Sequence, residues 1–364
     1  MQKHQVTVHG SQESPFAPRK QRYFRGAKGD IAREMPDIPL AARERLQHPI
    51  TRREAFKAGA AVMLPLAGAS SAPAAGKANA KPALTIGIST LGFRNHSNSQ
   101  LARELARQGI HTVQLFLNQT DSRYWKYNGR SDLSDLTPDR SKAIGEAYRS
   151  AGVSIHSMGV YTNLIHPDEA ERKANLAYFE AMMKVGAAMD VHTFISESGH
   201  YHSEEPAPRV AYYFQEQVWG MMVDVGKQLA ELAGRHNATV LFEPFFQSFF
   251  ASAKRTRLYL EAVDSPRIRA LLDPANLLEL NDTKEMFDQL GPWIDCLHAK
   301  DRKLHTRRGV PAGQGDLDYK EFVTLAAERT PNAPLVMEYV GPDDYKQALA
   351  HLQNAMCQAG IVPK

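Results

Sequence analysis

From Leu84 to the end of the chain, short hydrophobic runs alternate eight times with segments of helical periodicity, and this alternation limits the fold more than any other feature. The runs are rich in Val, Ile, Leu and Met and are bounded by turn residues, which is typical of buried strands. Strands that alternate with helices predict βαβ units and a parallel sheet. Eight such units in about 275 residues predict a (β/α)8 TIM barrel.

The expected elements can be placed along the chain from the same periodicity. The segment 118–137 is too irregular for a regular element. The expected strands cover residues 84–90, 111–117, 153–160, 191–198, 239–244, 268–273, 294–299 and 334–339. The expected helices cover residues 98–108, 138–151, 167–188, 208–236, 254–263, 283–290, 319–328 and 344–359.

A doubly wound nucleotide-binding sheet is the structural alternative. Such a sheet usually has fewer strands and a glycine-rich first turn. The first turn here, STLGFRNHSNS, has no G-x-G-x-x-G pattern. The sequence therefore predicts no nucleotide cofactor.

Residues 1–81 differ from the rest of the chain. Residues 1–50 are polar and basic without an apolar period, which predicts a disordered extension. In 51–81, Arg52 and Arg53 precede a moderately apolar stretch, Ala58–Ala69, and then small residues suited to cleavage. This order resembles a twin-arginine signal and predicts export by the twin-arginine machinery to the periplasm. A basic arm followed by a loose Ala-rich helix is the alternative.

The charge is distributed unevenly between these parts. Residues 1–81 hold 14 Lys and Arg against 6 Asp and Glu, whereas the remaining residues hold 30 against 34. The expected barrel, 82–364, is therefore slightly acidic. It gives no electrostatic reason to expect a nucleic-acid partner.

Four polar residues stand at the ends of the last four hydrophobic runs: Glu243, Asp273, His298 and Glu338. In a barrel, functional groups gather at the C-terminal ends of the strands. Three carboxylates and one imidazole suit a divalent cation. Each residue alone would be an ordinary cap or surface group, but four consecutive strand ends predict one metal site. Side-chain alternation would then place Leu241, Leu271, Ile294, Cys296 and Val336 inside the barrel.

The neighbouring loops supply candidates for substrate contact. Glu197 and His200 follow the fourth expected strand, and Lys300 follows His298 on the same inward side. The basic residues of 302–308 could bind an anion, but a solvated loop is the favoured interpretation. The aromatic residues after the fifth strand, and Trp125 with Tyr127, could line a pocket, pack under a loop or form a contact in a homo-oligomer.

Several motifs resemble one family. FEP around Glu243, LLDPAN around Asp273, HAKD at His298, the GQGDLDY segment and MEYVG at Glu338 resemble the xylose isomerase-like TIM-barrel superfamily, in particular its sugar phosphate isomerase/epimerase group. The resemblance covers about residues 84–356. It implies that the four residues bind one divalent metal ion, Mn, Mg, Co or Zn. It further implies that Glu243 and Glu338 are the acid/base pair, facing opposite sides of a bound sugar.

The function that the resemblance implies is a metal-dependent sugar isomerase or epimerase, which takes a proton from a carbon beside a carbonyl through an enediolate. Two rivals stay open: a lyase or hydrolase that cleaves keto-sugars or glycosides, and an exported sugar-binding barrel without catalysis. Asn276, a further candidate for substrate contact, stands where some family members have a histidine. The endonucleases of the superfamily need that histidine and a D-x-H motif after strand seven, and both are missing here.

Overall fold

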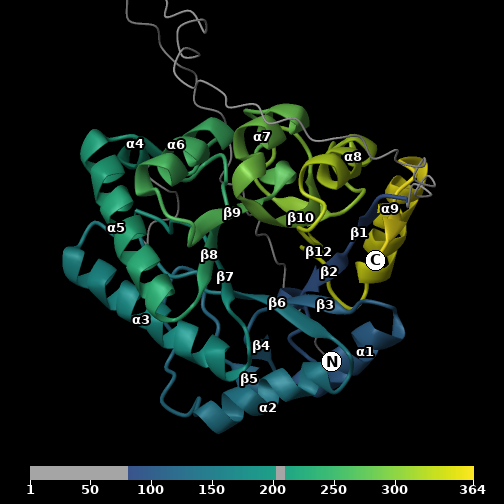
Figure 1. Ribbon diagram of the computed structural model, residues 1–364, viewed down its shortest axis with the longest axis horizontal. Helices are drawn as coiled ribbons and strands as arrows, with labels where there is room; N and C mark the ends of the chain where they lie inside the picture. Colours follow the sequence, from purple (N-terminus) through teal and green to yellow (C-terminus); the bar gives the residue numbers. More distant parts are fainter. Residues whose placement is uncertain (1–80, 202–209) are drawn as a thin grey trace, which may run out of the picture. The chain divides into compact units, whose positions relative to one another are not determined.

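Eight parallel strands close into a barrel in the computed structural model, which describes residues 81–201 and 210–364 (Figure 1). Neighbouring strands pair in chain order, and a further pairing of β10 with β9 closes the ring. The predicted TIM barrel is confirmed. The barrel strands are β2 (Ile86–Ser89), β3 (Thr112–Leu115), β6 (Ser154–Gly159), β7 (Thr193–Ser196), β8 (Thr239–Phe242), β9 (Ile268–Leu272), β10 (Ile294–Arg302) and β12 (Leu335–Met337).

Helices surround the barrel on its outer side (Figure 1). Most begin at a residue whose side chain accepts a hydrogen bond from the first turn; Ser97, for example, forms a capping box with Gln100. No helix in the described ranges is long and apolar enough to cross a membrane. The helices are α1 (Asn98–Arg107), α2 (Pro138–Arg149), α3 (Glu169–Ala188), α4 (Val210–Tyr213), α5 (Glu216–Arg235), α6 (Ala253–Val263), α7 (Thr283–Leu290), α8 (Tyr319–Arg329) and α9 (Tyr345–Gln358), with 3₁₀ turns at Thr90–Gly92, Pro274–Asn276 and Gly291–Trp293.

The prediction of one long helix over 208–236 is wrong, because α4 ends at Tyr213 and α5 begins at Glu216. Gln215 between them has an extended backbone. The Arg255 guanidinium donates a hydrogen bond to the Tyr213 carbonyl at 2.7 Å. In a continuous helix that carbonyl would accept from the backbone four residues later. Arg255 stabilises the break by satisfying it.

Several short strands lie outside the barrel ring. The segment 118–137, expected to be irregular, contains a small hairpin of β4 (Asn118–Gln119) and β5 (Ser122–Arg123). Near the two ends of the barrel sequence, β1 (Ala83–Leu84) pairs with β13 (Val362–Pro363). Strand β10 continues three residues beyond its expected end and pairs antiparallel with β11 (Gly309–Pro311). Of the basic run 302–308, Arg302 is therefore the buried last residue of β10, and residues 303–308 form the connection of a two-stranded ribbon.

The barrel interior is a separate apolar cluster from the core beneath the helices. Four of the five residues expected inside belong to it, which confirms the predicted alternation. The prediction for Ile294 is wrong, because this residue packs in the outer core. The pairing of β10 with β9 shifts register between Ile294 and Cys296, which turns Ile294 outward. The interior cluster holds Phe116, Tyr161, Ile195, Leu241, Leu271, Cys296 and Val336. The predicted extension 1–50 and signal 51–81 lie outside the described residues, except for Lys81.

Candidate metal centre and cavity

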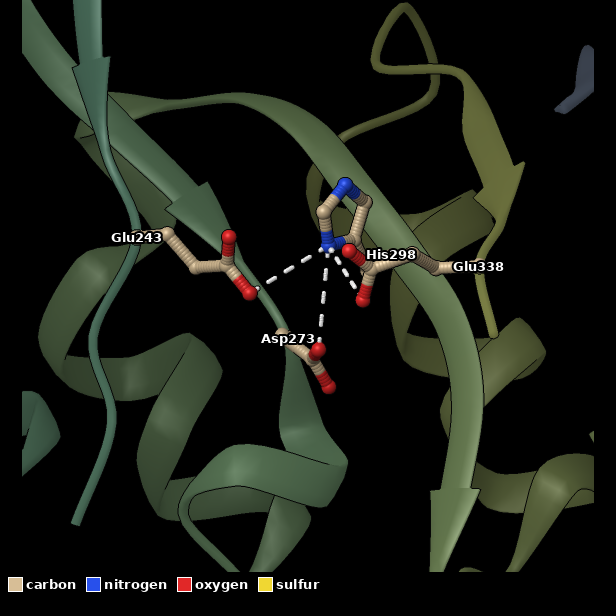
Figure 2. A group of neighbouring side chains, drawn as sticks. All are labelled: Glu243, Asp273, His298 and Glu338. Atoms are coloured by element: carbon tan, nitrogen blue, oxygen red, sulfur yellow. Dashed lines mark ion pairs between the residues drawn. The ribbon is translucent and has the colours of Figure 1, made fainter. Parts of the chain in front are cut away.

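The four predicted ligands meet above the interior cluster. Glu243, Asp273 and Glu338 directly follow β8, β9 and β12, and His298 lies within β10. One ligand atom from each lies within 4.8 Å of the other three, and all four residues are buried. Figure 2 shows the three carboxylates turned toward the imidazole ring. The His298 Nδ1 atom is 3.4 Å from Glu243 Oε1, 3.5 Å from Glu338 Oε2 and 3.7 Å from Asp273 Oδ2.

A residue that sequence reasoning missed orients the imidazole. His298 Nε2 lies 2.7 Å from Oε1 of Gln114, which comes from β3. An amide oxygen only accepts hydrogen bonds, so this contact assigns a proton to Nε2. In the neutral ring, Nδ1 then keeps its lone pair for a ligand in the centre. The sequence offers one signal for Gln114: it is the single amide side chain in the middle of the hydrophobic run HTVQLFL.

Lys300 lies within the carboxylate group. Its Nζ atom is 2.8 Å from Asp273 Oδ2, 2.9 Å from Glu338 Oε2 and 3.8 Å from Glu243 Oε1. Burial lowers the pKa of Lys300, but Asp273 and Glu338 outweigh burial and raise it well above its usual value. The ammonium also lies 4.5 Å from the centre of the Tyr339 ring. Lys300 therefore brings a permanent positive charge to the centre.

The two glutamates are held differently. Glu243 accepts hydrogen bonds from the Tyr161 hydroxyl and the Asn276 amide, both at 2.8 Å, whereas Glu338 accepts one from Lys300 at 2.9 Å. Burial raises the pKa of Glu243, but His298 and Lys300 outweigh it and lower the pKa to about 2. For Glu338, burial outweighs the same two cations and raises the pKa. Tyr161 and Asn276 thus fix the position of Glu243.

These residues fit one divalent cation. His298 Nδ1 is fully buried and has no hydrogen bond within the described ranges, although one oxygen of each of the three carboxylates lies within 3.7 Å of it. Buried polar atoms normally have a partner, so this nitrogen among three carboxylates indicates a ligand between them. Three carboxylates and one imidazole suit Mn, Mg, Co or Zn. The group Glu243, Asp273, His298 and Glu338 would hold the ion.

A cavity of about 630 Å³ opens above this centre. Glu243, Glu338 and Lys300 line it, and so does Glu197, one of the residues expected to contact substrate. The other two candidates do not line the cavity themselves but contact residues that do: the Asn276 amide donates to Glu243, and His200 Nε2 lies 3.0 Å from the Tyr127 hydroxyl. The cavity is lined by Ser89, Leu91, Gly92, Arg94, Phe116, Trp125, Tyr127, Tyr161, Glu197, Glu243, Lys300, Arg308, Glu338, Tyr339, Val340 and Gly341.

The aromatic residues divide between cavity and core. Trp125 and Tyr127 line the cavity. Phe249 and Phe250 are fully buried and pack with Tyr259, so they support the loop after β8.

The barrel, with these candidate ligands at the ends of its strands, matches one family over most of its length. The sequence model described as xylose isomerase-like TIM barrel matches residues 102–355. The chain belongs to this family. Among curated proteins no sequence match is found.

Solved structures share the fold at low sequence identity. A D-psicose 3-epimerase crystallised in the presence of D-fructose is 15% identical, with a TM-score of 0.57 over 76% of this chain and 98% of that one. The 3-keto-D-glucoside 4-epimerase YcjR from E. coli is 15% identical, with a TM-score of 0.59 over 74% and 99%. The IolI protein with a bound zinc atom is 16% identical, with a TM-score of 0.58 over 76% and 98%.

Proposed function

We propose that the protein is a divalent-metal-dependent isomerase or epimerase of a sugar or keto-sugar. The observation that carries this proposal is the pair of buried glutamates, Glu243 and Glu338, which belong to one candidate metal group and line one cavity. Two carboxylates and a cation beside a ligand-sized cavity are the parts needed to move a proton at a carbon next to a carbonyl.

The chemistry follows from the placement of these groups. A bound divalent cation would act as a Lewis acid toward the carbonyl and the neighbouring hydroxyl of the sugar. Strands β9 and β10 separate Glu243 from Glu338 in the barrel ring, so the two carboxylates approach a ligand from different sides. One takes the proton and leaves an enediolate, and the other returns a proton. Return to the opposite face of the same carbon epimerises it, and return to the neighbouring carbon isomerises the sugar.

The residues around the pair have supporting roles in this scheme. Tyr161 and Asn276 hold Glu243 in one orientation. Lys300, between Asp273 and Glu338, stabilises negative charge that develops on a ligand oxygen. The known neighbours support the assignment, because two of them are sugar epimerases and a third binds zinc.

Export by the twin-arginine machinery to the periplasm remains a prediction that rests on residues 51–81. It would bring the barrel into contact with free sugars and glycosides rather than with cytosolic metabolites. Replacement of Arg52 and Arg53 by Lys should retain the protein in the cytoplasm, as measured by cell fractionation.

The proposed function is tested by product analysis. The protein is loaded in turn with Mn²⁺, Mg²⁺, Co²⁺ and Zn²⁺ and incubated with a panel of sugars and keto-sugars. We expect NMR to show the epimer or isomer of at least one compound, and EDTA treatment to stop its formation. Tight sugar binding without conversion under every condition would instead support a sugar-binding barrel.

A further inference from the structure

Arg302 is a buried charged residue to which the proposed chemistry gives no role. It is the last residue of β10, four positions after His298, and only 1% of its surface is exposed. Arg302 does not line the cavity, and within the described ranges no hydrogen bond or ion pair joins it to the four candidate ligands. Burying a charged group is costly unless protein groups replace its water, so its contacts indicate its purpose.

The Arg302 guanidinium holds the turn that follows β9. Its Nε atom donates a hydrogen bond to the carbonyl of Ala275, the middle residue of the 3₁₀ turn Pro274–Asn276, at 2.6 Å. Asp273 caps this turn, because its Oδ1 atom accepts from the Asn276 backbone N–H at 3.3 Å. The other oxygen, Oδ2, faces the imidazole Nδ1 atom in the metal centre at 3.7 Å. The position of the turn therefore determines where this candidate ligand atom of Asp273 points.

The same guanidinium also contacts the loop after β8. It lies over the ring of Phe246, 4.3 Å from the ring centre. The Phe246 backbone N–H donates to the Asn276 carbonyl at 3.1 Å, and the Asn276 side chain donates to Glu243 Oε1 at 2.8 Å. This Glu243 oxygen is the one that faces the imidazole, at 3.4 Å. Arg302 and its contacts therefore join the ends of β8, β9 and β10, which are neighbours in the ring and supply three of the four candidate ligands.

Arg302 is itself held by the connection between β10 and β11. Its Nη1 atom donates to the Thr306 carbonyl at 3.0 Å and lies 3.5 Å from a carboxylate oxygen of Glu279. A guanidinium presents its donors in a rigid plane, so one group can bind carbonyls in two directions while it lies over a ring. A lysine ammonium is a compact charge without this planar fork. It would reproduce the charge of Arg302 but not the arrangement.

We propose that Arg302 is a positioning residue of the metal centre, which orients Asp273 and Glu243 toward the cation through the turn 274–276. This proposal rests on the proposed function only for the presence of a divalent cation, because it concerns how the ion is held and not what it does to a sugar. Groups that orient metal ligands from behind change metal affinity by about 10-fold to 100-fold when they are removed. The role of Arg302 can therefore be measured without a substrate.

The test compares two arginines that stabilise the same pair of strands at opposite ends. Arg269, near the start of β9, forms an ion pair with Asp295 of β10 and donates to the Pro292 carbonyl at 3.1 Å. Arg302→Met and Arg269→Met each remove a guanidinium but keep an unbranched side chain. For Arg302→Met we expect the affinity for Mn²⁺ and Zn²⁺, measured by competition with a chelator, to fall by about 10-fold to 100-fold. Arg269→Met should lower the unfolding temperature of the metal-free protein and leave metal affinity unchanged.

Bound Co²⁺ gives a second readout, because its visible absorption depends on the coordination geometry. We expect the Co²⁺ spectrum to change in Arg302→Met and to stay as in the wild type in Arg269→Met. Arg302→Lys, which keeps the charge, should recover only part of the lost affinity. If Arg302→Met does not fold, Phe246→Leu decides: it keeps the arginine but removes the ring beneath it, and should lower metal affinity by about 3-fold or more.

The outcomes separate this proposal from the function on which it rests. Wild-type affinity and an unchanged Co²⁺ spectrum in Arg302→Met, or in Phe246→Leu where that variant decides, would overturn the role of Arg302 and retain the metal centre. Equal losses of affinity in Arg302→Met and Arg269→Met would also overturn it, because a general loss of structure would then explain both. A wild-type protein that binds none of these ions would contradict the proposed function together with this proposal.

Discussion

The cavity has two sides that are built differently. On the metal side, Glu243, Asp273, His298 and Glu338 lie on strands or directly after them and are almost completely buried. The opposite side, called the aromatic side here, is formed by the rings of Tyr127 and His200. Both residues belong to connections between elements, and Tyr127 is 49% exposed. Strands hold side chains in fixed positions, whereas connections tolerate change. Under the proposed function, the metal side would perform the proton transfer and the aromatic side would select the ligand.

The largest effect should come from the acid/base pair. Glu338→Gln and Glu243→Gln keep an oxygen atom in place but remove a group that accepts a proton. We expect the rate of sugar conversion at saturating metal to fall by about 100-fold to 10,000-fold in each. Steady-state kinetics measures this loss, and the control Glu231→Gln, on the exposed face of α5, should behave as wild type. A loss below about threefold in both variants would show that neither glutamate takes part in the proton transfer.

A smaller effect should follow loss of the amide that orients His298. Gln114→Leu removes the acceptor at 2.7 Å from Nε2, so we expect metal affinity to fall by about 10-fold to 100-fold. Gln114→Glu supplies another acceptor and should retain most of the affinity. Competition with a chelator measures both variants. Equal affinities for wild type and Gln114→Leu would show that the contact does not prepare Nδ1 for a metal.

Metal binding should depend on pH through His298. Burial lowers the pKa of this group, but the nearby carboxylates of Glu338 and Glu243 outweigh burial and raise it to about 10 in the metal-free protein. A cation must displace that proton, so its affinity should rise about tenfold per pH unit between pH 7 and 9. Calorimetry in buffers of different ionisation enthalpy should show release of about one proton. Binding that is independent of pH and releases no proton would contradict this.

The raised pKa of His298 also determines how the stability of the metal-free protein depends on pH. The pKa of His298 rises from 6.5 to about 10 on folding. Its contribution to the stability of the metal-free protein is therefore fully present below pH 6.5 and is lost as the pH rises through about 10.

The smallest effect is expected on the aromatic side. Tyr127→Phe keeps the ring but removes the hydroxyl that contacts Glu197 and His200. The net value of one hydrogen bond corresponds to a change in sugar affinity of about 2-fold to 10-fold. Metal affinity should not change. Titrations with metal and with sugar separate the two sides, and a large loss of metal affinity in this variant would show that they are not independent.

The barrel and the positions of its ligands were predictable because both follow from local periodicity. Hydrophobic runs mark the strands, and a polar residue at the end of each marks the functional edge. Contacts between distant residues were not predictable in this way. His298 and Gln114 are 184 positions apart, and no local pattern joins them.

The errors have similar causes. Arg255 satisfies the Tyr213 carbonyl and stabilises a break that helical periodicity cannot detect. Pairing with β11 extends β10 through a segment that is basic and reads as a loop. The hydrogen bond from the Asn276 amide to Glu243 was likewise not predictable, because the two residues are 33 positions apart; substrate contact by Asn276 stays a prediction.

The measurement that tests the central claim most directly is deuterium incorporation by the metal-loaded protein. Keto-sugars are incubated in D₂O and followed by NMR. We expect deuterium at a carbon next to the carbonyl, with loss of incorporation in Glu338→Gln and retention in Glu231→Gln. A keto-sugar that binds tightly and stays unlabelled, or labelling that persists in Glu338→Gln at the wild-type rate, would contradict it.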